Sequence, residues 1–207
     1  MQGEGGTQSS VRIASSGGSG RPQSSGLVLL GIDPGLRVTG YGLILKSGQA
    51  LTHLDHGAVR THPGDHAARL LEIYESLGRL LTQWRVDEFA IEKQFMAVNA
   101  SSAFAVGEAR AVAIMSAALA GIPVFEYTPA EVKQAVTSYG RSSKEQIQEM
   151  VRLQFGLRVA PQPADAADAL AIAICHAAMR GRPQVSSQPP GVSSQRAAPT
   201  QRPGDWG

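Results

Sequence analysis

Residues 27–33 read Leu27-Val-Leu-Leu-Gly-Ile-Asp33, an uncharged run that leads directly into a carboxylate. A continuous apolar run of this length is typical of a central strand that is buried on both faces. Pro34-Gly35 follows at once and predicts a turn. Asp33 is therefore expected at the carboxyl end of a buried strand, which is where open α/β sheets place their functional sites.

The segments after this strand predict an α/β fold with a mixed five-stranded sheet, a three-strand antiparallel meander plus two parallel strands, flanked by helices. Ser47-Gly48 is a hairpin turn signal between two strands. Short apolar runs predict two further strands. The helical spacing of apolar residues and the capping residues predict five helices. The expected strands are 27–33, 39–46, 49–60, 88–92 and 122–126, and the expected helices are 65–84, 99–119, 129–137, 144–155 and 165–179.

Both ends of the chain differ in composition from the middle. Residues 1–26 hold seven Gly and seven Ser, and residues 181–207 hold five Pro, four Gly, four Ser and four Gln. Neither segment has the apolar periodicity needed to offset its ordering entropy. We therefore expect disordered tails at 1–26 and 181–207 and one domain at 27–180. The first tail lacks the apolar region of a signal peptide.

Net charge is a poor guide to the partner of this domain. The whole chain carries a net +2, but the tails hold five Arg against two acids, so residues 27–180 have 14 basic and 15 acidic residues. DNA binding by the domain must therefore rest on local sites. Cys175 is the single cysteine, which excludes an intrachain disulfide and a multi-cysteine zinc site. The chain has no run of eighteen apolar residues, so no membrane span is expected.

Four carboxylates share an unusual placement. Asp33 and Glu92 each end an apolar strand, while Asp165 and Asp168 are spaced i, i+3 and therefore project from one face of the last helix. If that helix packs against the two strand ends, four like charges converge and repel. Hard divalent cations such as Mg²⁺ or Mn²⁺ resolve this conflict. Two such ions can activate water and stabilise the leaving oxygen of a phosphodiester.

Three of the four acids also have an ordinary structural explanation. Asp33 before Pro-Gly is often a turn former. Asp165 and Asp168 lie near the start of a helix, where the dipole favours acids. With the four acids set aside, 14 basic and 11 acidic residues remain on the domain. A concentrated acidic site within a mildly basic surface is the resulting prediction.

Four blocks of this sequence, in order, resemble the RuvC family of bacterial Holliday-junction resolvases. They are Gly31-Ile-Asp-Pro-Gly-Leu-Arg-Val-Thr-Gly-Tyr-Gly42, Ala90-Ile-Glu-Lys-Gln-Phe-Met-Ala-Val-Asn99, Pro123-Val-Phe-Glu-Tyr127 with Val132-Lys-Gln134, and Ala164-Asp-Ala-Ala-Asp-Ala-Leu-Ala-Ile-Ala173. The resemblance spans nearly the whole domain and excludes the tails. It implies a ribonuclease-H-like fold and paired symmetric nicking of four-way DNA junctions, in recombination and repair, with 5′-phosphate products.

The resemblance also assigns the four acids as the family's catalytic and metal-binding residues, with two Mg²⁺ or Mn²⁺ ions per site. Asp33 and Glu92 are expected to hold the metals from the sheet. Asp168 is expected to bind one metal from the helix, and Asp165 to bind metal or orient the attacking water. Some relatives have His at the position of Asp165.

The predicted DNA-binding residues are Phe95, Lys133, Lys144, Arg37 and Arg141. The resemblance places a junction-contacting aromatic at Phe95, where the alternative is a core residue. It places phosphate-contacting lysines at Lys133 and Lys144. Arg37 and Arg141 are candidates by position alone, and an ordinary solvated charge is the alternative for each.

The predicted partners are four-way junction DNA, a second copy of the chain and, as the family implies, the RuvAB branch-migration complex, in the bacterial cytoplasm near the nucleoid. Ala103, Gly107, Ala111 and Met115 form a row on the long helix that suits either sheet packing or a twofold interface. Cys175 is expected to be buried, and His176 to lie on the surface of the last helix. Two alternatives remain: a related nuclease acting on RNA or linear DNA, and a single-domain actin-like phosphate-binding protein.

Overall fold

The computed structural model describes residues 13–15, 26–93, 100–137 and 142–180, and it contains one mixed sheet in the order β1-β4-β3-β2-β5-β6. The central strands β2, β3 and β4 form an antiparallel meander. On the other side of β2, β5 and β6 add parallel strands. The bounds are β1 Ile13–Ser15, β2 Leu27–Asp33, β3 Val38–Ser47, β4 Ala50–Arg60, β5 Glu88–Glu92 and β6 Val124–Tyr127.

The sheet has one strand more than the five predicted. Strand β1 pairs antiparallel with β4, with Ala14 opposite Ala58. It lies in the segment predicted as a tail, and the edge of β4 offers the unpaired main-chain groups that a short extra strand can use. Residues 1–12, 16–25 and 181–207 lie outside the described residues, so the division into tails and domain stays a prediction.

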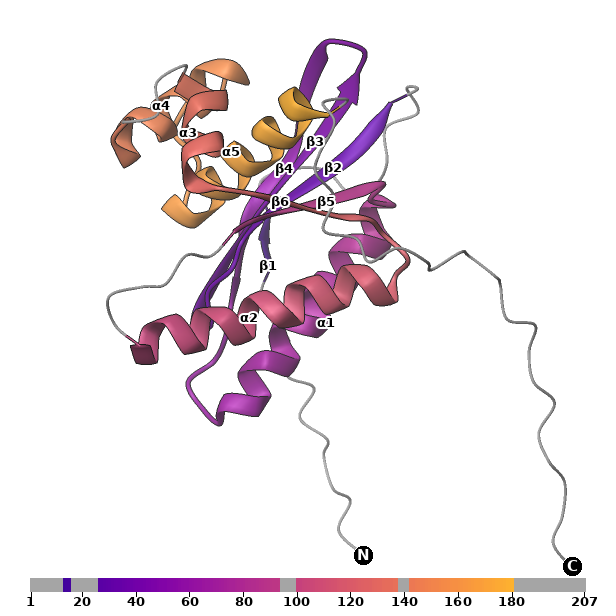
Figure 1. The fold of residues 1–207 in the computed structure, drawn as a ribbon, viewed down its shortest axis with the longest axis vertical. Coiled ribbons are helices and arrows are strands. Elements are labelled where there is room, and N and C mark those ends of the chain that lie inside the picture. Colours follow the sequence, from indigo (N-terminus) through magenta and orange to yellow (C-terminus); the bar gives the residue numbers. More distant parts are fainter. Residues whose placement is uncertain (1–12, 16–25, 94–99, 138–141, 181–207) are drawn as a thin grey trace, which may run out of the picture.

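The described helices cover both faces of the sheet (Figure 1), with α1 and α2 on one face and α3, α4 and α5 on the other. Strand β2 shows why two layers are needed, because Leu30 packs with α1 and α2 whereas Leu29 packs with α5. The bounds are α1 His66–Trp84, α2 Ala100–Leu119, α3 Pro129–Thr137, α4 Lys144–Gln154 and α5 Ala164–Met179. These elements confirm the predicted order of strands and helices.

Helix starts are set by local capping. Asp65 caps α1 by accepting from the amide of Ala67 at 3.1 Å. Ser143 caps α4, and Gln146 completes a capping box. This cap fixes Lys144 as the first residue of α4, which matters for the site described below.

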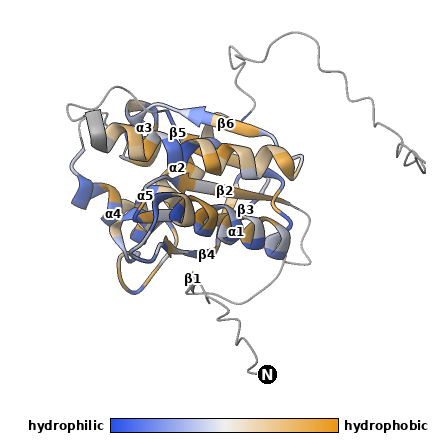
Figure 2. Cartoon of the chain, turned by 90° about the horizontal axis from the view of Figure 1, so that it is seen from below, coloured by the Kyte–Doolittle hydropathy of each residue, from blue (hydrophilic) through white to orange (hydrophobic). Residues whose placement is uncertain are grey.

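Hydrophobic residues run along much of α2 and α5 (Figure 2). In α5 they are buried, and Ala169, Ala173 and Cys175 are fully buried, as predicted for the cysteine. Among the described helices, none is both long enough and apolar enough to span a membrane.

Candidate active site

Asp33 is the last residue of β2, and the turn after it is held by a threonine. The Thr39 hydroxyl donates to the carbonyl of Gly35 at 2.7 Å, and the Gly35 amide donates back to that hydroxyl at 3.3 Å. Thr39 is itself buried. The carboxylate of Asp33 therefore extends from a strand end with little freedom.

Glu92 ends β5, the strand next to β2. The register places Ile91 beside Ile32, so the carboxyl ends of the two strands lie at the same edge of the sheet. Beyond Glu92, the amide of Lys93 donates to the carbonyl of Tyr127 at 2.6 Å. The strands thus bring Asp33 and Glu92 together, as their positions in the sequence predicted.

The third element, α5, lies directly on the main chain of β2 and β3. A Cβ atom built at Gly40 would lie 2.0 Å from the carbonyl oxygen of Asp165, and one built at Gly31 would lie 2.1 Å from that of Ala169. Glycine is required at both positions because any side chain would overlap the backbone of the helix. Because of this close approach, the first turns of α5, which contain Asp165 and Asp168, lie near the ends of the strands that carry Asp33 and Glu92.

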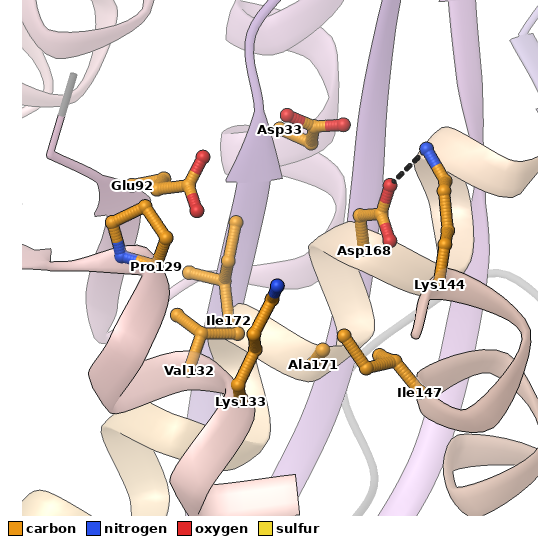
Figure 3. A pocket seen from close by; sticks show the side chains of 10 residues that line it. All are labelled: Asp33, Glu92, Pro129, Val132, Lys133, Lys144, Ile147, Asp168, Ala171 and Ile172. Carbon is orange, nitrogen blue, oxygen red and sulfur yellow. Dashed lines mark ion pairs between the residues drawn. The ribbon is translucent and has the colours of Figure 1, made fainter. Parts of the chain in front are cut away.

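Three of the four acids line a pocket of about 240 Å³ (Figure 3). Asp33 from β2, Glu92 from β5 and Asp168 from α5 surround it, and Lys133 from α3 and Lys144 from α4 border it. The ammonium of Lys144 lies 2.7 Å from a carboxylate oxygen of Asp168. Apolar side chains form the rest of the wall, namely Pro129, Val132, Ile147, Ala171 and Ile172.

The carboxylates destabilise one another's charge. Burial raises the pKa of Asp33 to about 7, and the charges of Asp168, Glu92 and Asp165 contribute further, while Lys144 opposes the shift. Burial also raises the pKa of Glu92, with the Asp168 charge adding to the effect and the two lysines opposing it. The pocket therefore holds more negative charge than its lysines balance.

Asp165 contributes to this field without lining the pocket. Its charge raises the pKa of both Asp33 and Lys144, so it lies near the pocket's edge. The structure therefore brings together three of the four predicted acids around the pocket and places the fourth beside them.

The donor set suits a hard divalent cation in its chemistry, because carboxylate oxygens are the ligands that these ions prefer. Burial is the main cause of the raised pKa of Asp33, and the neighbouring carboxylates add to it, so a cation would stabilise the charged form of this residue. Across the described ranges, no three His, Cys, Asp or Glu side chains are grouped closely enough to hold one ion. The ammonium of Lys144 instead provides the positive charge at Asp168.

The predicted DNA-binding residues divide into three groups. Lys133 and Lys144 border the pocket. Arg37 is exposed just before β3. Phe95 and Arg141 lie outside the described residues.

The row of small residues on α2 is half-buried at Ala103 and Gly107 and exposed at Ala111 and Met115. The helix packs through Ala109, Ala113 and Ala117, whereas Ala111 and Met115 are exposed. Sheet packing therefore does not explain Ala111 and Met115, and a twofold interface stays a prediction. The exposed face also carries Phe104 and Leu119, which are 70% and 68% exposed.

A buried polar network at the other end of α5 was not predicted from the sequence. His176 was expected on the surface but is fully buried. Its ring contacts the Tyr127 hydroxyl at 2.7 Å and the Glu88 carboxylate at 2.8 Å, and Arg180 also donates to Glu88. Burial lowers the pKa of His176, so the neutral ring accepts from Tyr127 and donates to Glu88. The amphipathic pattern gave no signal, because α5 has apolar residues on every face.

The site also includes Arg110 of α2, which the sequence did not single out. Its Nε donates to the main-chain carbonyl of Glu92 at 3.2 Å, and its guanidinium forms an ion pair with Glu126 of β6. The sequence signal for Arg110 was its charge in the middle of a largely apolar helix, where a charged residue needs a partner.

The arrangement suits hydrolysis of a phosphodiester. Its carboxylates can hold cations, and its two lysines can contact phosphate oxygens.

Comparison with known proteins agrees with this chemistry. The family described as "Crossover junction endodeoxyribonuclease RuvC" matches residues 29–176. The protein of that name from Brevibacillus brevis is 48% identical over 153 residues, covering 73% of this chain and 92% of its own length. The one from Geobacter sulfurreducens is 51% identical over 150 residues, covering 72% and 91%.

Solved structures agree as well. Thermus thermophilus RuvC in complex with a Holliday junction substrate matches with a TM-score of 0.68 and 37% identity, covering 73% of this chain and 93% of that one. The fold is therefore ribonuclease-H-like, as the resemblance implied. Since the family match spans nearly all the described residues and relatives are about half identical, the chain belongs to the RuvC family of crossover junction endodeoxyribonucleases.

Proposed function

We propose that this chain resolves four-way DNA junctions by metal-dependent hydrolysis in the pocket formed by Asp33, Glu92 and Asp168. The observation that carries the proposal is the convergence of three carboxylates from three separate elements on one pocket that two lysines border. RuvC nucleases are metal-dependent. Two bound Mg²⁺ or Mn²⁺ ions would supply activation of water and stabilisation of the leaving oxygen.

The chain's own residues have distinct tasks in this proposal. Asp33 and Glu92 hold cations from the rigid sheet, and Asp168 does so from α5. Lys133 and Lys144 hold the phosphates of the strand that is cut, and Lys144 exchanges Asp168 for phosphate when DNA arrives. Asp165, at the pocket's edge, orients the attacking water. The products carry 5′-phosphate and 3′-hydroxyl ends.

The enzyme acts as a homodimer in this proposal, because two symmetric nicks need two sites related by a twofold axis. The exposed face of α2 with Phe104, Met115 and Leu119 is the candidate interface, since a helix face this apolar favours a protein partner. The RuvAB complex is the proposed partner on the junction, and Phe95, Arg37 and Arg141 are further proposed DNA contacts. The cytoplasm near the nucleoid is the proposed location.

The test uses labelled four-way junction, linear duplex and RNA–DNA hybrid, each with Mg²⁺, Mn²⁺ or EDTA. We expect paired symmetric nicks in the junction alone, and only with metal. Asp33→Asn is expected to bind the junction but not to nick it, whereas Glu75→Gln, an exposed acid on α1, should nick normally.

Unchanged nicking by Asp33→Asn would contradict the proposed site. Equal cutting of duplex or hybrid would favour the related nuclease alternative. The actin-like alternative is wrong because the chain belongs to the RuvC family. Actin-like proteins also need two related halves.

A further inference from the structure

Arg110 lies on α2, the helix with the candidate dimer interface, and contacts the end of β5, the strand that carries Glu92. Its Nε donates to the Glu92 carbonyl at 3.2 Å, and its guanidinium pairs with the Glu126 carboxylate. The Arg110 side chain is 20% exposed and that of Glu126 is 33% exposed, so water competes only partly for these contacts. A guanidinium is a rigid planar fork, so it can fix two acceptors relative to each other.

The two acceptors lie at the ends of adjacent strands. Glu126 faces Ile91 in the register of β5 and β6, one residue before Glu92. At Glu92 the carboxylate points toward the pocket (Figure 3), while the carbonyl of the same residue accepts from Arg110. Holding that carbonyl restricts the main chain from which the carboxylate extends.

We propose that Arg110 is a positioning residue that, braced by Glu126, sets the place of the Glu92 carboxylate in the pocket. The inference rests on the proposed role of Glu92 as a metal ligand. Arg110 itself lines no part of the pocket, so it acts through Glu92 and not on the substrate. Groups that orient metal ligands typically change metal affinity or activity by 10- to 100-fold when they are removed.

A purely structural role for Arg110 makes a different prediction. An arginine that only fastened α2 to the sheet would alter stability and leave metal affinity unchanged in the folded protein. Metal affinity without DNA therefore separates the two roles, and Mn²⁺ binding followed by electron paramagnetic resonance measures it directly.

The variants are Arg110→Met, Arg110→Lys and Glu126→Gln, with Arg79→Met as the matched control. Arg79 lies on α1, where it contacts Ser76 and Glu75 away from the pocket. Arg110→Met is expected to weaken Mn²⁺ binding 10- to 100-fold, to slow nicking at fixed metal concentration, and to leave junction binding in EDTA unchanged. Arg110→Lys should show a smaller loss, because an ammonium keeps the charge but not the fork. Glu126→Gln keeps an acceptor and should change least.

A second arm tests whether Arg110 acts through Glu92. In a Glu92→Gln background, Arg110→Met should weaken Mn²⁺ binding no further. The proposal is overturned if Arg110→Met and Arg110→Lys both bind Mn²⁺ like the parent, or if the loss is as large in the Glu92→Gln background. Failure of the proposed function would look different, because Asp33→Asn would then keep normal nicking whatever Arg110 does.

Discussion

Replacement of Gly40 by alanine should strain the contact between α5 and strand β3 of the sheet. The new Cβ would lie 2.0 Å from the carbonyl oxygen and 2.4 Å from the carbonyl carbon of Asp165, whereas real Cβ atoms essentially never come closer than 3.0 Å to another heavy atom. Both clashing atoms belong to the main chain, so no side-chain rotation relieves the overlap. Strand β3 and α5 must separate by about 1 Å.

The expected consequence for stability follows from overpacking. Insertion of a methyl group into a packed interface typically costs about 1–3 kcal/mol. The consequence for catalysis is larger in relative terms, because a shift of about 1 Å in a positioned group can lower the rate on the order of 100-fold. The displaced turn contains Asp165, and Asp168 follows one turn later.

The assay compares single-turnover nicking with urea unfolding at a temperature where Gly40→Ala remains folded. Junction binding should be retained, because the lysines lie on α3 and α4. Gly78→Ala is the matched control, since a Cβ at this position in α1 meets nothing within 4 Å and should raise stability by about 0.5–1 kcal/mol. A Gly40→Ala protein that nicks at the parent rate would refute the argument that the glycine contact sets the position of the acids.

The remaining predictions concern charge. Metal-free Asp33→Asn should be more stable than the parent protein at pH 8. The pKa of Asp33 is about 7 in the folded protein and 3.8 when unfolded. The parent therefore loses stability as pH rises between these two values, by as much as about 4 kcal/mol. Urea unfolding in EDTA measures this, and an equal difference at pH 4 and pH 8 would contradict it. Lys133→Met should weaken junction binding and lower the slope of log affinity against log salt by about one, as expected for one lost phosphate contact. Lys46→Met, at the distant β3–β4 hairpin, should leave the slope unchanged in the same titration.

The elements of this fold were predictable wherever local pattern and tertiary packing agree. Strand β2 is an unbroken apolar run, and the hairpin turn at Gly48 has the positive φ of 59° that glycine favours. Asp33 and Glu92 were predictable because each ends such a strand. The extra strand β1 was not, since its three residues resemble the segment around them and owe their conformation to the free edge of β4.

The contacts that organise the site were harder to predict because they join distant segments. The Lys144–Asp168 ion pair depends on how α4 lies beside α5. Arg110 binds a main-chain carbonyl, which carries no sequence signal. The glycines of β2 and β3 did carry a sequence signal, because glycine inside a buried strand indicates a close backbone approach. Gly31 and Gly42 are paired across these two strands.

The two ends of α5 together explain how the fold maintains a site whose charges repel. Burial raises the pKa of Asp33, and the charges of Asp168, Glu92 and Asp165 raise it further. The part of this repulsion that comes from Asp165 and Asp168 would be relieved if α5 moved away from the strands. At its first turns the helix lies on glycine main chain, with no intervening side chain that could adjust. At its last turn, His176 is held between Tyr127 and Glu88, both from parallel strands of the same sheet. Because a rigid helix is fixed at both ends, the acids cannot separate. Lys144 balances the charge of Asp168, and a bound cation would balance the charge that the lysines leave.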